Sequence, residues 1–241
     1  MGTLALGLAH EIRNPLNAAV LQMHLLGKQV DREVASKDAR ASMRDRVQIV
    51  VGEIKRLGRL LTEFLELARP RGLAREAVPI GEVLDSVIEL HQAEASMRGV
   101  VASRVEQGPK DARVLGDREK LRQVFINLFV NALDATPSGG TVRMTTRTRG
   151  GRVVIEVHDD GGGIAEADLP RLFDPFFTTK PGGTGLGLSI VRKILEQHGG
   201  AVIVRSKAGS GTTVEVELPA AADAPPTLPN APPGATNAAP G

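Results

Sequence analysis

Two glycine-rich turns in one stretch carry residue types that could hold a nucleotide. The first contains Asp159, Gly161 and Gly163 and follows an apolar alternating run. A carboxylate at a strand end followed by glycines lets the backbone approach a planar ligand and offers an acceptor to an exocyclic amine. The second, residues 183–187 (GTGLG), opens a predicted helix whose free N–H groups favour phosphate. Either turn alone is more typical of a hairpin or a flexible loop, but together they predict a nucleotide site.

Two asparagines upstream could serve the phosphates of such a ligand. Asn127 and Asn131 lie four residues apart on a helix that we expect to run from its cap at Asp117 to about Asp134. Two amide oxygens on one helix face can face a hydrated Mg²⁺ ion and a phosphate. The alternative is a pair of solvated surface amides. The apolar stripe of this helix lies on a different face and comprises Leu121, Val124, Phe125 and Leu128.

A histidine near the start of the chain has neighbours that could activate it. His10 points roughly 160° away from the apolar seam of its helix, Asn14 shares its face, and Glu11 borders that face. Pro15 weakens the helix beside it. An exposed imidazole next to a carboxylate can be held in one tautomer and made more nucleophilic. Periodicity alone favours the plainer alternative, a solvated surface histidine, and His24 is interpreted in that way.

Composition excludes several classes of protein. The 241 residues carry a formal net charge of +2, without a clustered basic tract or aromatic platform for nucleic acid. Cysteine is absent, which excludes disulfides and thiolate metal sites. No apolar run approaches the ~18–20 residues of a membrane span, and the N-terminus lacks a signal-peptide pattern. We therefore expect a soluble, cytoplasmic chain that makes no membrane contact itself.

The first 70 residues predict an antiparallel helical hairpin. One helix covers residues 1–30, residues 31–37 interrupt the pattern, and a second helix ends at Pro70. A hairpin alone buries too little, so two copies forming a four-helix bundle, and hence a homodimer, are expected. The predicted seams are Leu8, Ile12, Leu16, Ala19, Met23, Leu26 and Val30, and then Val47, Val50, Ile54, Leu57, Leu61 and Phe64.

The rest of the chain predicts a second domain, so the fold class is α+β. A linker at residues 71–77 leads to an α/β sandwich over residues 78–219, with a mixed sheet and its helices on one face. Residues 220–241 are rich in Ala and Pro and predict a disordered tail. The strands are expected at 78–80, 100–105, 141–148, 152–159, 201–205 and 212–218, and the helices at 83–91, 117–134 and 188–198.

Five motifs in order resemble those of sensor histidine kinases of two-component systems. AHEIRNPLNA resembles the H box, NLFVNALDA the N box, DDGGGI the first glycine box, FDPFFTTK the F box and GTGLGLSI the second glycine box. The resemblance covers residues 4–219. Its first part resembles the HisKA dimerisation and phosphoacceptor domain, and the remainder the ATP-binding domain shared with gyrase and MutL. The TTK and NALDA forms are similar to the nitrogen-regulation type.

This resemblance implies roles for the helical hairpin. His10 would attack the γ-phosphate of ATP, and Glu11 would accept the imidazole proton or hold the tautomer. Asn14 would position water for dephosphorylating a partner. That partner would be the receiver domain of a response regulator, phosphorylated on an aspartate.

The resemblance also implies roles in the second domain. Asn131, supported by Asn127, would bind Mg²⁺; Asp159 would accept from the adenine amino group; and Thr212 would reach adenine through water. Further nucleotide-binding residues would shape the pocket or hinge a lid: Gly161, Gly163, Lys180, Gly183, Thr184, Gly185, Leu186 and Gly187.

Two departures from the family pattern stand out. Many members carry a basic residue three positions after the magnesium-binding asparagine, where this chain has Asp134, so a lid cation such as Lys180 would meet the phosphate instead. Met1 lies only nine residues before His10, so the chain resembles a fragment or starts at an internal methionine.

Two other functions compete with the kinase interpretation. One is a nucleotide-switched dimerisation module that transfers no phosphate, which the intact H box disfavours. The other is a serine kinase similar to the anti-sigma-factor kinases, which lack a preceding phosphoacceptor hairpin.

Overall fold

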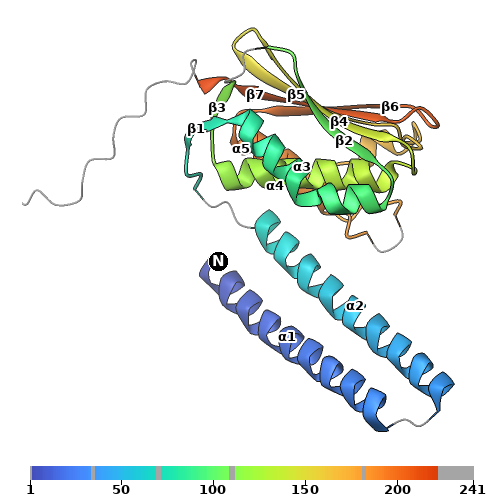
Figure 1. Ribbon diagram of the computed structural model, residues 1–241. Helices are drawn as coiled ribbons and strands as arrows, with labels where there is room; N and C mark the ends of the chain where they lie inside the picture. Colours follow the sequence, from blue (N-terminus) through green and yellow to red (C-terminus); the bar gives the residue numbers. More distant parts are fainter. Residues whose placement is uncertain (1, 34–35, 69–71, 109–111, 181–182, 222–241) are drawn as a thin grey trace, which may run out of the picture.

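A computed structural model describes residues 2–33, 36–68, 72–108, 112–180 and 183–221, with the side chains of residues 2–15, Glu33, Arg59 and 66–68 left undescribed. The chain forms a long helical arm joined to a rounded domain (Figure 1). No helix in these ranges combines the length and the apolarity needed to cross a membrane.

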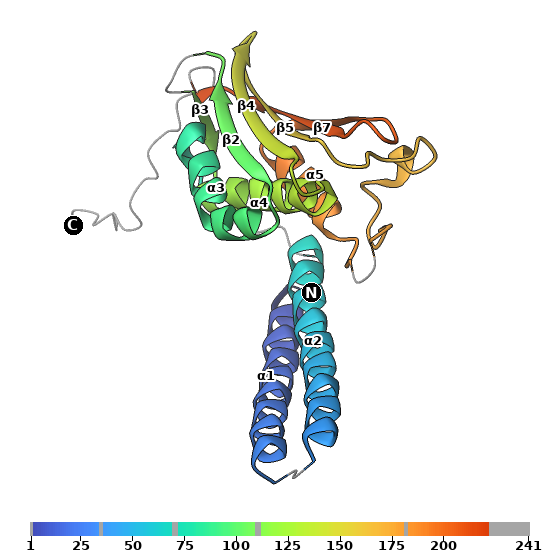
Figure 2. The same cartoon turned by 45° about the vertical axis from the view of Figure 1, so that its right-hand side comes forward.

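The arm is the predicted helical hairpin. Helix α1 (Gly2–Glu33) and helix α2 (Lys37–Ala68) lie side by side along their length (Figures 1 and 2). Val30, Val47 and Val51 are buried between them. α1 extends three residues past the predicted end at residue 30, so the connection is shorter than expected.

Part of the predicted seam stays exposed in the single chain. Val50, Leu57 and Phe64 of α2 recur every seven residues, and their exposed fractions are 41%, 53% and 52%. Leu26 of α1, which was also assigned to the seam, is 45% exposed. We call the exposed residues Val50, Leu57 and Phe64 the open apolar strip.

The second domain is built on a five-stranded mixed sheet. Its strand order is β2-β4-β5-β7-β6, in which β2 pairs with β4 in parallel and the other pairs are antiparallel. The strands are β2 (Val101–Glu106), β4 (Thr141–Arg149), β5 (Arg152–Asp159), β6 (Ala201–Ser206) and β7 (Thr212–Pro219). The prediction of a mixed sheet is confirmed.

Three helices cover one face of this sheet (Figures 1 and 2). They are α3 (Ile80–Met97), α4 (Arg118–Ala135) and α5 (Gly187–Gln197). Asp117 caps α4, because its Oδ1 accepts from the Lys120 N–H at 3.1 Å. The predicted apolar stripe of α4 is buried in the core. The core also contains four residues of α5: Ile190, Val191, Ile194 and Leu195.

Charged side chains occupy the opposite sheet face, on which none of the described helices packs. The Glu215 carboxylate is 3% exposed and accepts hydrogen bonds from Arg147 Nη2 at 2.9 Å and Arg205 Nη1 at 3.1 Å. The hydrogen bond from Arg205, assisted by Arg147, lowers the pKa of Glu215. Because these charges are paired in place, the sheet can face water on this side.

The boundaries of two predicted elements were wrong. Ile80 begins α3 and does not end a strand, because β1 covers Glu76–Pro79 and so starts inside the predicted linker. β1 pairs with β3 (Arg113–Gly116), a strand that we did not predict because four residues show too little alternation.

The predicted tail starts one residue too early. The Ala220 N–H donates to the Gly151 carbonyl at 2.9 Å, and Ala220 bridges Val114, so this residue belongs to the domain. Residues 222–241 lie outside the described part of the chain.

His198 ties the end of α5 to the start of α4. Its Nε2 accepts from the Asp117 N–H at 3.0 Å, so its Nδ1 carries the proton and donates to the Ile194 carbonyl at 2.7 Å. Its side chain is buried, and this burial lowers the pKa of His198. The native state therefore holds a neutral imidazole.

We expect the stability of this domain to fall in acid through His198. The unfolded chain takes up a proton at about the ordinary pKa of 6.5, whereas the folded state does so only at lower pH. The contribution is thus fully present above that value and is lost as the pH falls below it. His198→Gln should lower the free energy of unfolding at pH 7.5 and flatten its decline toward pH 5, measured by urea denaturation. Equal slopes for the two proteins would contradict this assignment.

Candidate functional site

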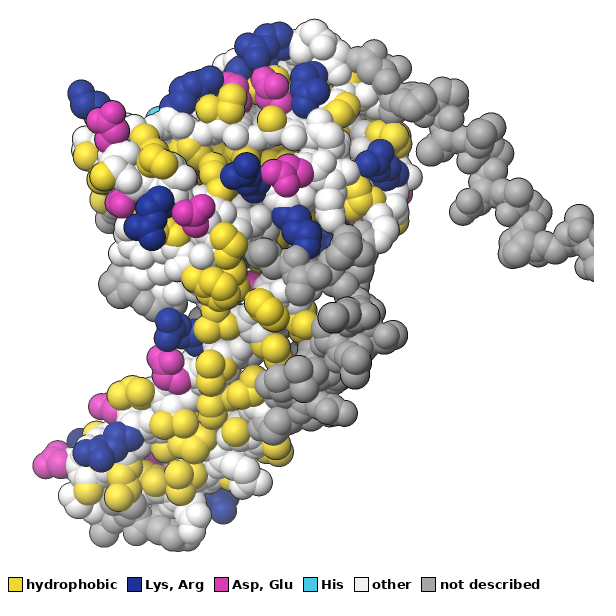
Figure 3. All heavy atoms as spheres, turned by 180° about the vertical axis from the view of Figure 1, so that it is seen from behind, with side chains coloured by type: hydrophobic (Ala, Val, Ile, Leu, Met, Phe, Trp, Pro, Cys, Tyr) yellow, Lys and Arg dark blue, Asp and Glu magenta, His cyan; other side chains and the backbone are white. Residues whose placement is uncertain are grey.

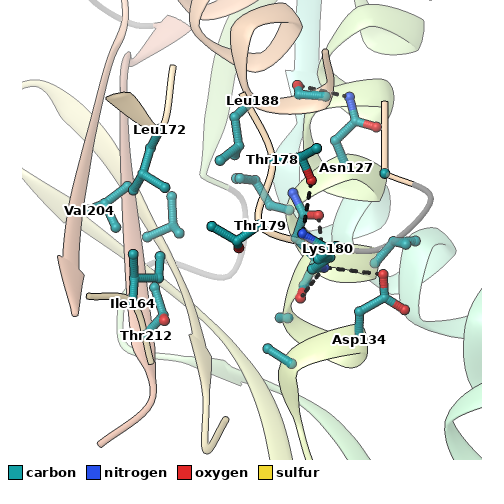
Figure 4. A pocket seen from close by; sticks show the side chains of 18 of the residues that line it. Asn127, Asp134, Ile164, Leu172, Thr178, Thr179, Lys180, Leu188, Val204 and Thr212 are labelled. Carbon is teal, nitrogen blue, oxygen red and sulfur yellow. Dashed lines mark hydrogen bonds and ion pairs between the residues drawn. The ribbon is translucent and has the colours of Figure 1, made fainter. Parts of the chain in front are cut away.

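A cavity of about 800 Å³ opens between α4, the facing ends of β5 and β7, and the segment that precedes α5 (Figure 4). We call the described residues 168–180 and 183–186 of that segment the lid. A cavity of this volume is in the range that small-molecule and cofactor sites occupy.

Asp159, the last residue of β5, lines the cavity. It is 5% exposed, and its Oδ1 accepts from the Gly161 N–H at 2.9 Å. Burial raises the pKa of Asp159, while hydrogen bonds from the N–H groups of Gly161 and Thr212 oppose that rise. A buried carboxylate in a cavity wall is an acceptor that can select a ligand by its donors.

Glycines let two backbone segments close around the cavity. Gly163 has φ +67°, and a Cβ there would lie 2.1 Å from the Lys207 carbonyl oxygen in the β6–β7 turn. Gly185 has φ +69°, and its Cβ would lie 2.4 Å from the carbonyl carbon of Phe176. The Phe176 N–H donates to the Gly185 carbonyl at 2.9 Å, which joins the middle of the lid to its C-terminal end.

The polar face of α4 lines the other side of the cavity. Asn127 donates through Nδ2 to the Gly187 carbonyl at 3.4 Å. Lys180 reaches across from the lid: its Nζ lies 3.3 Å from Asn131 Oδ1 and 3.2 Å from Asp134 Oδ2 (Figure 4). An ammonium group held by an amide oxygen and a carboxylate marks a position that suits a cation.

The cavity brings most of the predicted nucleotide-binding residues together. Gly161 and Leu186 are not on its wall: Gly161 acts through its N–H on Asp159, and Leu186 is buried in the hydrophobic core. The predicted residues that do line it are Asn127, Asn131, Asp159, Gly163, Lys180, Gly183, Thr184, Gly185, Gly187 and Thr212.

The side chains of the predicted phosphoacceptor group cannot be placed in the structure. His10, Glu11 and Asn14 belong to α1 by their backbone, but their side chains lie outside the described residues.

Two contributors to the cavity were missed by sequence reasoning. Thr178 accepts the Lys180 N–H through its Oγ1 at 3.1 Å and so shapes the lid; the FDPFFTTK motif that contains it was a usable signal. Glu63 of α2 also lines the cavity, and its Oε2 is buried without a hydrogen-bond partner among the described residues. No sequence pattern could reveal Glu63, because its position depends on how the arm meets the second domain.

Two family models match the chain. The model described as histidine kinase-, DNA gyrase B-, and HSP90-like ATPase matches residues 116–222. The model described as His Kinase A (phospho-acceptor) domain matches residues 1–72.

Individual histidine kinases also match the chain in sequence and in structure. The chain is 37% identical over 219 residues to the sensor histidine kinase ZraS of Escherichia coli K12, which covers 91% of this chain and 45% of ZraS. The chain therefore spans about half the length of such relatives. Full-length ShkA in complex with AMPPNP has a TM-score of 0.74 and 29% identity, over 91% of this chain and 46% of ShkA. The histidine kinase ThkA in complex with the response regulator TrrA has a TM-score of 0.66 and 28% identity, over 90% of this chain and 61% of ThkA.

We expect the backbone conformation at Gly163 to be required for the fold of the cavity. Gly163→Ala would force an L-residue into the left-handed region and against the Lys207 carbonyl, lowering the free energy of unfolding by at least about 1–2 kcal/mol. Gly162→Ala is the matched control, because a Cβ there meets nothing within 4 Å. Thermal unfolding of both variants checks this, and equal loss of stability would contradict it.

Proposed function

The chain belongs to the histidine kinases, whose phosphoacceptor hairpin precedes a gyrase- and HSP90-like ATPase domain, and from that premise we propose that it is an ATP-dependent protein-histidine kinase. It phosphorylates itself on His10 and passes the phosphoryl group to an aspartate on the receiver domain of a response regulator. Asn14 would also position a water molecule that hydrolyses the phosphoryl group from that partner.

The cavity is the observation that carries this proposal. It combines a buried acceptor, two glycine-rich turns and the asparagine face of α4 around a volume of about 800 Å³. Asp159 would accept a hydrogen bond from the exocyclic amine of adenine, which guanine cannot donate at that position. Thr212, paired with Asp159 across β5 and β7, would reach the same base through water.

The phosphate end of the cavity lies toward the lid and α4. Asn131, supported by Asn127, would hold a Mg²⁺ ion, which neutralises phosphate charge when bound. The ammonium group of Lys180 already lies against Asn131 Oδ1, which supports this oxygen as a cation ligand. The free N–H groups at the start of α5 face the cavity at Gly187 and would receive phosphate oxygens.

The transfer requires positioning more than covalent work by the cavity. A ring nitrogen of His10 forms the bond to the γ-phosphorus, while the bond to the bridging oxygen breaks and its electron pair leaves with ADP. Glu11 accepts the proton released by the imidazole. The phosphohistidine then carries the group to the acceptor aspartate.

A homodimer would bury the apolar residues that the hairpin leaves exposed. Figure 3 shows hydrophobic side chains gathered along the arm. The open apolar strip lies on α2 of this arm and is exposed in the single chain. A second copy of the hairpin would bury this strip in a four-helix bundle.

The kinase proposal predicts a specific covalent product. Incubation with γ-labelled ATP and Mg²⁺ should label the wild type with phosphate that is lost in acid and survives base. His10→Gln should abolish this label, because it removes the attacking nitrogen. His24→Gln is the matched control on the same helix and should label normally, since His24 is hydrogen-bonded to the Val20 carbonyl of its own helix.

Each other outcome identifies a competing function. Nucleotide binding without any label, in a chain extended upstream of Met1 as well, would indicate a nucleotide-switched module. Acid-stable label on a partner serine would indicate a serine kinase similar to the anti-sigma-factor kinases.

The dimer proposal predicts a loss of association from one charge on the open apolar strip. Burying a Leu side chain contributes about 1.5–3 kcal/mol, so Leu57→Glu should raise the dissociation constant of the dimer more than about tenfold. Gln48→Glu adds the same charge at an exposed position on the opposite side of α2 and should leave it unchanged. Sedimentation equilibrium measures both, and an unchanged constant in Leu57→Glu would contradict the interface.

A further inference from the structure

A row of alternating charges links the end of α3 to the lid. Arg98, the residue after α3, donates through Nη1 to Asp134 Oδ1 at 2.9 Å and through Nη2 to Glu94. Lys180 of the lid donates to the other oxygen of Asp134, Oδ2, at 3.2 Å. Asp134 therefore divides its two oxygens between a fixed arginine and a lid lysine.

The Asp134 carboxylate stands where a negative charge is unfavourable by itself. It lies in the last turn of α4, where the helix dipole disfavours anions. It also borders the cavity at the end where we place the phosphates. Pairing with Arg98 and Lys180 offsets both effects in the absence of ligand.

Lys180 cannot serve two partners fully at once. In this structure its ammonium group is shared among Asp134 Oδ2, Asn131 Oδ1 and the Asn131 carbonyl at 3.4 Å. These contacts hold the lid against α4 (Figure 4). A phosphate group in the cavity would compete with them for the same ammonium.

We propose that Asp134 is a positioning residue that latches the lid. It holds Lys180 against α4 when the cavity contains no nucleotide, with Arg98 fixing the orientation of its carboxylate, and it competes with the phosphates for Lys180 when nucleotide binds. The inference rests on the proposed nucleotide site. The latch orders the lid before binding and lowers the affinity for the triphosphate.

The first test measures the lid without nucleotide or metal. Amide hydrogen exchange of residues 168–180, followed by mass spectrometry, should be faster in Asp134→Asn and in Lys180→Gln than in the wild type. Because both side chains are about a third or more exposed, we expect only about a two- to fivefold increase. The double variant should exchange no faster than Lys180→Gln alone, since that substitution already removes the contact with Asp134.

The second test measures the affinity of the same variants for a non-hydrolysable ATP analogue with Mg²⁺ by calorimetry. Asp134→Asn should bind more tightly, because a competitor for Lys180 and a charge facing the phosphates are gone. Lys180→Gln should bind more weakly. If Asp134 and Lys180 only maintained the fold, the two substitutions would change the affinity for the analogue in the same direction.

Controls separate the latch from general effects of charge. Glu119→Gln removes an exposed carboxylate at the opposite end of α4, and Lys207→Gln removes an exposed ammonium from the β6–β7 turn. Both should match the wild type in the two tests. Unchanged lid exchange in Asp134→Asn, additive effects in the double variant, or weaker analogue binding by Asp134→Asn would each overturn the proposal.

Failure of the latch is distinguishable from failure of the proposed function. The exchange measurement needs no ligand, so it tests the contact between Asp134 and Lys180 alone. If the wild type binds no ATP analogue, the nucleotide site itself is wrong, whatever the lid does.

Discussion

The C-terminal domain is arranged around one carboxylate at the end of β5 that is shielded from bulk water. Burial raises the pKa of Asp159, and hydrogen bonds from the N–H groups of Gly161 and Thr212 oppose that rise. Thr212 is available only because β5 and β7 pair in the register that sets it opposite Asp159. A Cβ at Gly211 would lie 2.1 Å from the Asp159 carbonyl oxygen, so the close approach of these two chain segments also requires glycine. The strand register, the glycine turns and the Asp159 acceptor therefore depend on one another.

Sequence reasoning predicted the elements that have strong local patterns. The apolar stripe of α4 and the cap at Asp117 were confirmed, because periodicity and capping chemistry act over a few residues. β3 and the true end of the domain at Ala220 were missed, because short strands and single bridges depend on partners distant in the chain. In the cavity the glycines were recognisable as motifs. The meeting of Lys180 with Asp134, and the place of Glu63, depend on tertiary packing and had no pattern to predict them.

The two domains differ in how completely a single chain buries its apolar residues. The sheet and its three helices enclose their core within the chain, and the open sheet face is covered by paired charges around Glu215. The helical arm buries Val47 and Val51 but leaves the open apolar strip in solvent. One domain thus has a closed core, and the other presents one half of a core.

The cavity wall draws on residues that are far apart in the chain, from Glu63 on α2 to Val214 on β7. No segment shorter than residues 63–214 contains the whole cavity wall, so the unfolded chain offers nothing equivalent to a ligand. Whatever fills the cavity therefore stabilises the arm junction and the sheet together by mass action. At a hundred times its dissociation constant, a ligand adds about 2.7 kcal/mol to the free energy of unfolding. The durability of this protein in a cell is thus set partly by how much of its ligand the cell contains.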